Sequence, residues 1–284
     1  MKWQGRRQSR NIEDRRGVRS AGGAAGAGGI GVILIVVVGY FLGVDLTPLL
    51  QQGGGPEITA GGDVELSPEE QRAGEFVSVT LADTEEVWAA VFSGQLRQTY
   101  DPPTLVLFSG TTQSACGGAS SATGPFYCPP ERKIFLDTAF FETMERRLGA
   151  RGDFAAAYVV AHEVAHHVQN ELGILDQANR ERERSSETRS NQISVMIELQ
   201  ADCFAGIWAR AAEQRFGSIE PGDIDEAIHA AGQIGDDMLQ RSAGQTVQPH
   251  TFTHGTSAQR QRWFLRGYQS SDVGQCDTFS ARQL

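Results

Sequence analysis

The segment from Phe154 to Leu172 constrains the fold of this chain more than any other part of the sequence. It reads FAAAYVVAHEVAHHVQNEL, contains no glycine or proline, and is followed by Gly173. Because alanine favours helices and glycine commonly ends them, the segment predicts a helix of about five turns. Most of its side chains are small or aliphatic, so we expect a buried helix whose few polar side chains need partners.

Three of these polar side chains have the spacing of a metal site. His162 and His166 are four residues apart, so both project from one face of the helix, and Glu163 lies between them in an HExxH pattern. Imidazole suits zinc, and a hydrolytic zinc site has three protein ligands and a water. The alternative is that ordinary hydrogen bonds satisfy the three side chains, which the apolar surroundings disfavour.

A second buried helix is predicted from about residue 192 to 214, where apolar residues recur at helical spacing. Glu198 and Asp202 lie four residues apart on this helix and would face the same way. We expect Glu198 to be the third metal ligand. Asp202 would accept a hydrogen bond from the far nitrogen of a ligating histidine and so fix its tautomer. The alternative for this pair is a solvated face or a salt bridge with Arg210.

The rest of the domain is predicted to be mainly helical with a small sheet, an α+β arrangement. Ser67 and Pro68 are typical of a helix start, and the helix-rich stretch reaches about Arg97. Short apolar runs at 104–108 and 133–136 predict strands that pair, and the second strand is expected to offer an exposed edge to an extended peptide. Further helices are expected at about 224–240 and 257–268, and either a solvated loop or a helical extension at 175–191.

The first quarter of the chain predicts a membrane anchor. Residues 1–20 hold seven of the 25 basic residues and two of the 35 acidic residues, and the 25 residues from Ser20 to Val44 carry no charge. Such a stretch is long enough to cross a bilayer, and a cleaved signal peptide is the alternative. The positive-inside rule then gives a basic cytoplasmic tail at 1–20, a transmembrane anchor at 21–44, a flexible linker at 45–66 and an extracytoplasmic domain at 67–284.

Charge and cysteine content indicate which partners the domain binds and whether it contains disulfides. The formal net charge is −10 although the N-terminus is basic, so the domain is acidic and a nucleic-acid partner is not expected. Four cysteines in a domain expected outside the cytoplasm favour two disulfides. Of the three possible pairings we favour Cys116–Cys128 with Cys203–Cys276, because the first would close a loop rich in glycine and serine. Buried free thiols are the alternative.

Several segments together resemble one bacterial family, the neutral zinc metallopeptidases. The resemblance rests on KWQGRRQSRNIEDRRG, FYCP, KIFLDTAFF, AYVVAHEVAHHVQN, IELQADCFAGIWA, IGDDMLQ and FTHGTSAQRQRWF, hence on most of the chain. It implies a single-pass membrane protein with a mostly helical, zincin-like domain. Matched residue by residue, it places His162, His166 and Glu198 on the zinc-ligand positions and Glu163 on the general-base position.

The expected activity is hydrolysis of a peptide or protein substrate at the membrane surface, with one zinc ion per chain. Glu163 would take a proton from the attacking water and pass it to the leaving amine. His254, with Arg260 six residues later, is the candidate donor to the developing oxyanion, ahead of Tyr158, and a core or helix-entry histidine is the alternative for it. His167 points away from the two ligands and is expected to be structural or to support a ligand. The alternatives are a zinc protein that docks a partner without proteolysis and a zinc hydrolase with another substrate.

Overall fold

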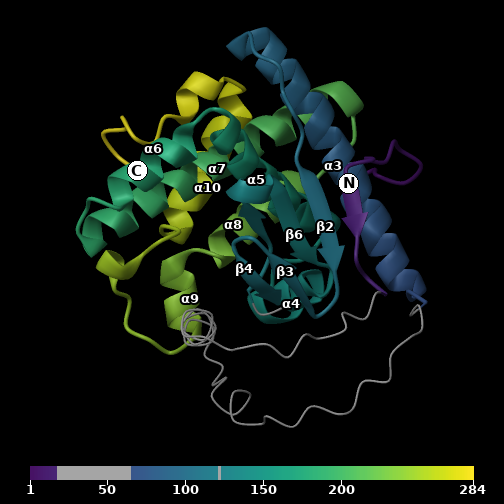
Figure 1. Ribbon diagram of the computed structural model, residues 1–284, viewed down its shortest axis with the longest axis horizontal. Coiled ribbons are helices and arrows are strands. Elements are labelled where there is room, and N and C mark those ends of the chain that lie inside the picture. Colours follow the sequence, from purple (N-terminus) through teal and green to yellow (C-terminus); the bar gives the residue numbers. More distant parts are fainter. Residues whose placement is uncertain (18–64, 121–122) are drawn as a thin grey trace.

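A four-stranded sheet with helices packed on it forms the domain (Figure 1). The computed structural model describes residues 1–17, 65–120 and 123–284. The strand order is β1 (Ile12–Asp14), β2 (Thr104–Phe108), β6 (Lys133–Asp137) and β5 (Phe126–Cys128). β2 is parallel to both β1 and β6, and β5 is antiparallel to β6. The predicted strands at 104–108 and 133–136 are confirmed, and they pair with each other.

Both faces of the central strands are buried, because successive side chains of a strand point to opposite faces. Leu105 and Ile134 belong to the main core, which the helices complete. Val106 and Phe135 belong to a second apolar cluster that includes Ala119. This second cluster lies under the antiparallel hairpin of β3 (Thr111–Ser114) and β4 (Gly117–Ser120). Burial on both faces explains why these strands read as continuous apolar runs in the sequence.

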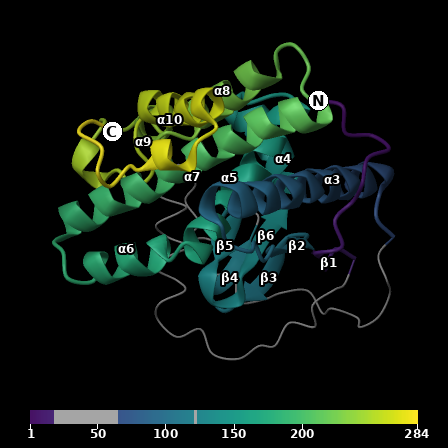
Figure 2. The same cartoon turned by 90° about the horizontal axis from the view of Figure 1, so that it is seen from above.

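The helix predicted from Phe154 to Leu172 is confirmed as α5 (Asp153–Glu171), at the centre of the domain (Figure 2). α5 contacts β5 and β6 as well as α7 (Glu187–Phe216) and α8 (Asp223–Gln233), so it lies between the sheet and a second layer of helices. Fifteen of its 19 residues are buried. Because the polar residues of α5 cannot reach bulk solvent on most of its surface, they are satisfied inside the protein.

The other elements follow the predicted pattern with three differences. α3 (Pro68–Val91) begins at Ser67 with a capping box, as expected, and continues into a π-helical turn, Phe92–Leu96. The helix expected at 224–240 is divided into α8 and α9 (Asp236–Ser242), because the backbone at Gly235 is extended and lies against Ser257. The charged stretch after Gly173 forms α6 (Ile174–Arg182), and a further helix, α4 (Ala139–Leu148), was not predicted. The remaining elements are α10 (Ser257–Ser270) and short 3-10 turns at Pro129–Glu131, Pro249–Thr251 and Val273–Cys276.

Two glycines allow α7 and α10 to pack with their backbones in close contact. A Cβ atom on Gly206 would lie 2.0 Å from the carbonyl oxygen of Phe264, and one on Gly267 would lie 1.8 Å from that of Cys203. Any side chain at either position would push the helices apart. This close packing brings Arg260, on α10, into the buried contact with α7 that is described below.

The two predicted disulfides are confirmed. Cys116–Cys128 spans 12 residues, and Cys203–Cys276 spans 73 and ties α7 to the C-terminal segment. Since a disulfide restricts the unfolded chain more when it closes a longer loop, we expect Cys203→Ala/Cys276→Ala to lower the free energy of unfolding by about 2–4 kcal/mol. Urea unfolding should show a smaller loss for Cys116→Ala/Cys128→Ala. An equal or larger loss for that short loop would contradict the expectation.

The expected membrane topology is wrong. Among the helices in residues 1–17, 65–120 and 123–284, none is long and apolar enough to cross a bilayer. The predicted anchor at 21–44 lies outside the described residues. The N-terminal segment supplies β1, which is hydrogen-bonded to β2 in the domain's own sheet. A strand cannot be separated by a bilayer from the sheet to which it belongs, so a cytoplasmic tail with an extracytoplasmic domain is excluded.

Acidic side chains of α3 bind two arginines of the basic N-terminal segment. Arg6 donates hydrogen bonds of 2.6 and 2.7 Å to the two carboxylate oxygens of Asp83. Arg7 forms ion pairs with Glu85 and Glu86. Burial raises the pKa of Asp83 to about 6, against the opposing effect of Arg6. Two of the basic residues that suggested an orientation in a membrane, Arg6 and Arg7, therefore pair with acids of the same domain.

Candidate metal centre

Three side chains from two helices converge on one point. His162 and His166 project from α5, and Glu198 projects from α7. One possible ligand atom from each lies within 4.8 Å of the other two. His162 Nε2 is 3.1 Å from Glu198 Oε2, and His166 Nε2 is 3.6 Å from Glu198 Oε1. The structure therefore brings together the three residues that the sequence suggested as ligands.

These separations fit a zinc ion. Zinc binds imidazole nitrogen and carboxylate oxygen at about 2.0–2.2 Å with tetrahedral geometry, which places neighbouring ligand atoms about 3.3 Å apart. The two measured nitrogen–oxygen separations lie on either side of that value. Two imidazoles and one carboxylate also leave a fourth position for water, which is typical of hydrolytic rather than structural zinc sites.

Asp202 lies behind His162, one turn after Glu198 on α7. Its Oδ1 is 2.9 Å from His162 Nδ1, and it accepts a hydrogen bond of 2.5 Å from the hydroxyl of Tyr158. Arg260 donates to both of its oxygens, from Nε at 2.8 Å and from Nη2 at 3.0 Å. A carboxylate only accepts hydrogen bonds, so Nδ1 of His162 carries a proton and Nε2 is the nitrogen directed at Glu198.

The charges of the site favour a cation. Burial opposes a positive charge on His162, but its hydrogen bonds with Asp202 and Glu198 raise its pKa to about 9. Burial acting alone would raise the pKa of Glu198, yet the neighbouring His166 and His162 bring it well below its usual range. Against the effect of burial, Arg260 and His162 likewise lower the pKa of Asp202, so Glu198 and Asp202 are both charged at neutral pH. A divalent cation at this point would be held by the neutral imidazole of His162 in place of its Nε2 proton.

Glu163 and the three converging residues line one cleft of about 570 Å³. The Glu163 side chain is 7% exposed, and burial raises its pKa against the opposing effect of His166 and His162. A raised pKa makes a carboxylate a stronger base, so Glu163 is suited to exchange a proton with a water in the cleft. Apolar side chains complete much of the cleft wall, among them Phe126, Phe140, Val159 and Leu175.

His254 lines the same cleft from the loop before α10. Asp236, the first residue of α9, accepts the backbone N–H of His254 at 2.6 Å and lies 3.2 Å from its Nδ1. Desolvation opposes its charge, but the hydrogen bond with Asp236 and the charge of Glu198 raise the pKa of His254. With Nδ1 bound to Asp236, Nε2 is the nitrogen suited to contact a ligand. Its side chain is 48% exposed, unlike that of the ligand candidates.

Two other candidates have structural positions. His167 is fully buried, with Nδ1 3.0 Å from the Tyr127 hydroxyl and Nε2 2.7 Å from the carbonyl oxygen of Asp101. His167 thus connects α5 to β5 and to the loop before β2, in keeping with the structural role expected for it. Tyr158 is also fully buried, and its hydroxyl is bound to Asp202. Tyr158 therefore belongs to the network behind His162.

The strand expected to offer an exposed edge to a substrate does not offer one. β6 is between β2 and β5, so Lys133–Asp137 has hydrogen-bonded neighbours on both sides and offers no edge. β5 is the terminal strand of the sheet, and Phe126 and Tyr127 on it line the cleft. The sequence pattern identified the longer, more apolar strand, which is the interior one, because interior strands of a sheet are more uniformly apolar than edges.

Sequence reasoning missed two contacts of the site. Arg260 was considered only for its spacing from His254, whereas it lies against Asp202, with one guanidinium nitrogen 3.9 Å from Glu198. Gln169 Oε1 lies 2.9 Å from His166 Nδ1. Gln169 follows His166 by three residues, and this spacing on a helix is a signal that could have identified the contact.

The fold is that of a mainly helical α+β protein, and the cleft brings together three side chains that could hold a metal ion. The chain belongs to the family described as "Putative neutral zinc metallopeptidase", which matches residues 1–279 and implies zinc as the metal. An uncharacterized Escherichia coli protein, YpfJ, is 45% identical over 288 residues, covering 98% of this chain and 99% of that protein. An uncharacterized Mycobacterium tuberculosis protein is 42% identical over 218 residues, 73% of this chain and 71% of that protein. No solved structure is significantly similar.

Proposed function

We propose that this chain is a zinc-dependent peptidase with a zincin-like centre. One zinc ion per chain would be held by His162, His166 and Glu198, and Asp202 would orient His162. The observation that carries the proposal is the convergence of these ligand atoms within 4.8 Å in a cleft that Glu163 also lines. A structural zinc site has four protein ligands and needs no base, so the three-residue set beside a buried glutamate favours catalysis.

The proposed reaction is hydrolysis of a peptide bond. When bound, zinc would supply Lewis acidity, making water a better nucleophile and the peptide carbonyl a better electrophile. Glu163 accepts the proton of the attacking water and returns it to the nitrogen of the leaving amine. The raised pKa of Glu163 supports the first step, because a higher pKa makes the carboxylate a stronger base toward the water.

Two further features of the cleft support a peptide as the substrate. The edge strand β5 can pair with an extended backbone, which gives hydrogen bonds that do not depend on the substrate's sequence. His254 lines the cleft and lies against Asp236 through Nδ1, so its Nε2 would donate a hydrogen bond to the developing oxyanion. The acidic net charge of the chain agrees with a protein or peptide partner rather than a nucleic acid.

Metal removal tests this proposal. We expect a chelator to abolish hydrolysis of denatured casein by the full chain, and one equivalent of zinc to restore it, because the chemistry depends on the bound ion. Glu198→Ala should bind zinc too weakly for metal analysis to detect after dialysis. Hydrolysis that survives complete removal of metal would overturn the proposal. A chain that binds zinc but cleaves no member of a peptide library would instead favour a non-proteolytic protein that docks a partner.

A further inference from the structure

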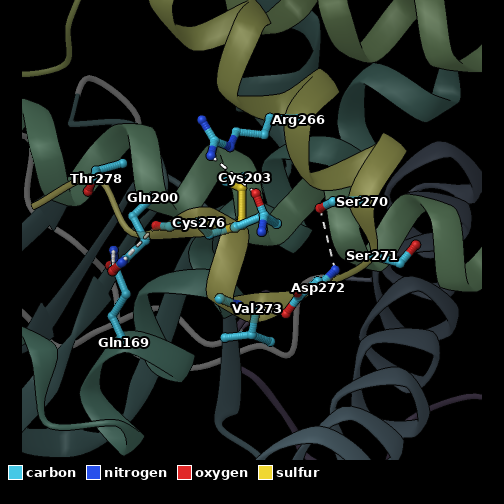
Figure 3. Close-up of a disulfide and its surroundings, with 12 residues drawn as sticks. Gln169, Gln200, Cys203, Arg266, Ser270, Ser271, Asp272, Val273, Cys276 and Thr278 are labelled. Carbon is cyan, nitrogen blue, oxygen red and sulfur yellow. Dashed lines mark hydrogen bonds between the residues drawn. A yellow bond between two sulfur atoms is a disulfide. The ribbon is translucent and has the colours of Figure 1, made fainter. Parts of the chain in front are cut away.

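A series of buried amides connects a proposed zinc ligand to a disulfide (Figure 3). Gln169 Oε1 lies 2.9 Å from His166 Nδ1, and Gln169 Nε2 donates to Gln200 Oε1 at 3.0 Å. Gln200 Nε2 donates in turn to the carbonyl oxygen of Cys276 at 3.0 Å, and Cys276 is bonded to Cys203. Gln169 is fully buried and Gln200 is 5% exposed. The mechanism above uses neither glutamine.

The direction of these hydrogen bonds is determined at the Cys276 end. A carbonyl oxygen only accepts, so Gln200 turns its amide nitrogen to Cys276 and its oxygen to Gln169. Gln169 Nε2 also donates to the carbonyl oxygen of Ile197 at 2.8 Å, so a flipped amide would place its oxygen against two other oxygens. Gln169 therefore presents its oxygen to His166. The proton of that imidazole then lies on Nδ1, and Nε2 keeps its lone pair for the metal.

The two histidines are thus oriented by partners of different strength. His162 is held by the ionised Asp202, which Arg260 fixes in place. His166 is held by a neutral amide, and hydrogen bonds between neutral groups are about half as strong as those to a charged partner. The orientation of His166 consequently depends more on how firmly the groups behind Gln169 are positioned.

The C-terminal segment that supplies the Cys276 carbonyl is fastened to α7 at two points. One is the disulfide between Cys276 and Cys203, and both sulfur-bearing residues are fully buried. The other is the Thr278 hydroxyl, which donates to the carbonyl oxygen of Met196 at 2.7 Å. Figure 3 shows Gln200 between Gln169 and the Cys203–Cys276 disulfide. The acceptor at the end of the amide series is therefore rigidly placed.

We propose that Gln169 and Gln200 are positioning residues for His166, and that the Cys203–Cys276 disulfide extends this positioning to the C-terminal segment. The inference rests on the proposed function, because it takes His166 to be a zinc ligand. Removal of an amide or of the disulfide allows the His166 ring to adopt the other tautomer, which places a proton on the nitrogen that the metal needs. The effect is a weaker zinc site with an altered coordination geometry.

Near-isosteric replacements test the two amides in the full chain. Zinc affinity is measured by competition with a chelating dye, and geometry by the visible absorption bands of the cobalt-loaded protein. We expect Gln169→Met to weaken zinc binding about 10–100-fold and to shift the cobalt bands, with a smaller loss for Gln200→Met. Because Gln200 acts through Gln169, the double variant should bind zinc as weakly as Gln169→Met alone. Independent structural effects would add instead.

The two disulfides provide a test and its matched control. Cys203→Ala/Cys276→Ala should weaken zinc binding and shift the cobalt bands, whereas Cys116→Ala/Cys128→Ala should leave both unchanged. Zinc affinity within about twofold of the parent in Gln169→Met, or equal losses from the two disulfides, would overturn the inference. If Gln169→Met does not fold, Gln200→Met and the disulfide pair decide the question by the same criteria. A parent without zinc affinity would refute the proposed function as well, whereas an active zinc-binding parent with unaffected variants refutes this inference alone.

Discussion

Replacement of Glu163 by glutamine should lower the rate of peptide hydrolysis by about 10²–10⁴-fold and leave the bound zinc in place. The amide has the same shape as the carboxyl group but cannot accept the proton of the attacking water. Residue 163 is not one of the proposed ligands, which are His162, His166 and Glu198, so the zinc content should stay at about one ion per chain. A 10³-fold loss corresponds to about 4 kcal/mol of additional activation free energy.

The measurement is cleavage of denatured casein by the full chain, with metal analysis of the same samples. Glu145→Gln is a matched control, because Glu145 is an exposed residue of α4 and does not line the cleft. The control should keep both the activity and the zinc of the parent. Equal cleavage by parent and Glu163→Gln would show that another group acts as the base, and loss of zinc from Glu163→Gln would show that this residue also holds the metal.

The local part of the site could be read from the sequence, because helical spacing alone places residues on one face. His162 and His166 on one helix, and Glu198 and Asp202 on another, each lie four residues apart, and helical spacing puts each pair on one side. The strong apolar character of both segments predicted that the helices are buried. What spacing could not show is that the two faces meet, which the packing of α5 against α7 provides.

The sheet contains a strand that short-range sequence patterns could not predict. β1 consists of three residues, Ile12–Asp14, and two of them are acidic, so nothing in its composition distinguishes it from a loop. It becomes a strand because β2 offers it an unpaired edge and because Arg6 and Arg7 bind acids on α3. Arg6 and Arg7 are two of the seven basic residues that gave the mistaken membrane orientation. A charge count shows how much positive charge a segment carries but not which groups it contacts.

Contacts between residues far apart in the chain were the least predictable. Arg260 follows Asp202 by 58 residues, and Gln200 precedes Cys276 by 76. Both contacts depend on α10 and the C-terminal segment lying against α7, which the glycines at 206 and 267 and the disulfide permit. The cysteine pairing was the one long-range feature that the sequence suggested, since each cysteine has few possible partners.

Arg260→Leu should lower the free energy of unfolding by about 3–5 kcal/mol, because it removes the guanidinium that binds both oxygens of the buried Asp202 carboxylate. The Arg260 side chain is 2% exposed and that of Asp202 is not exposed at all. Urea unfolding in the presence of a chelator measures this loss without the stabilisation that bound metal adds. Arg262→Leu is the matched control, since Arg262 is exposed on the same helix and should cost no more than about 0.5 kcal/mol.

A double variant distinguishes the effect of this ion pair on stability from its effect on metal binding. In Asp202→Leu/Arg260→Leu both charges are gone, so the double variant should recover part of the stability that Arg260→Leu loses. Zinc affinity should not recover, because His162 then lacks the carboxylate that holds its Nδ1 proton, a loss of about 10–100-fold. If the two substitutions destabilise additively, Arg260 and Asp202 do not act as a pair. If zinc affinity returns with stability, Asp202 serves the fold rather than the orientation of the metal-binding histidine.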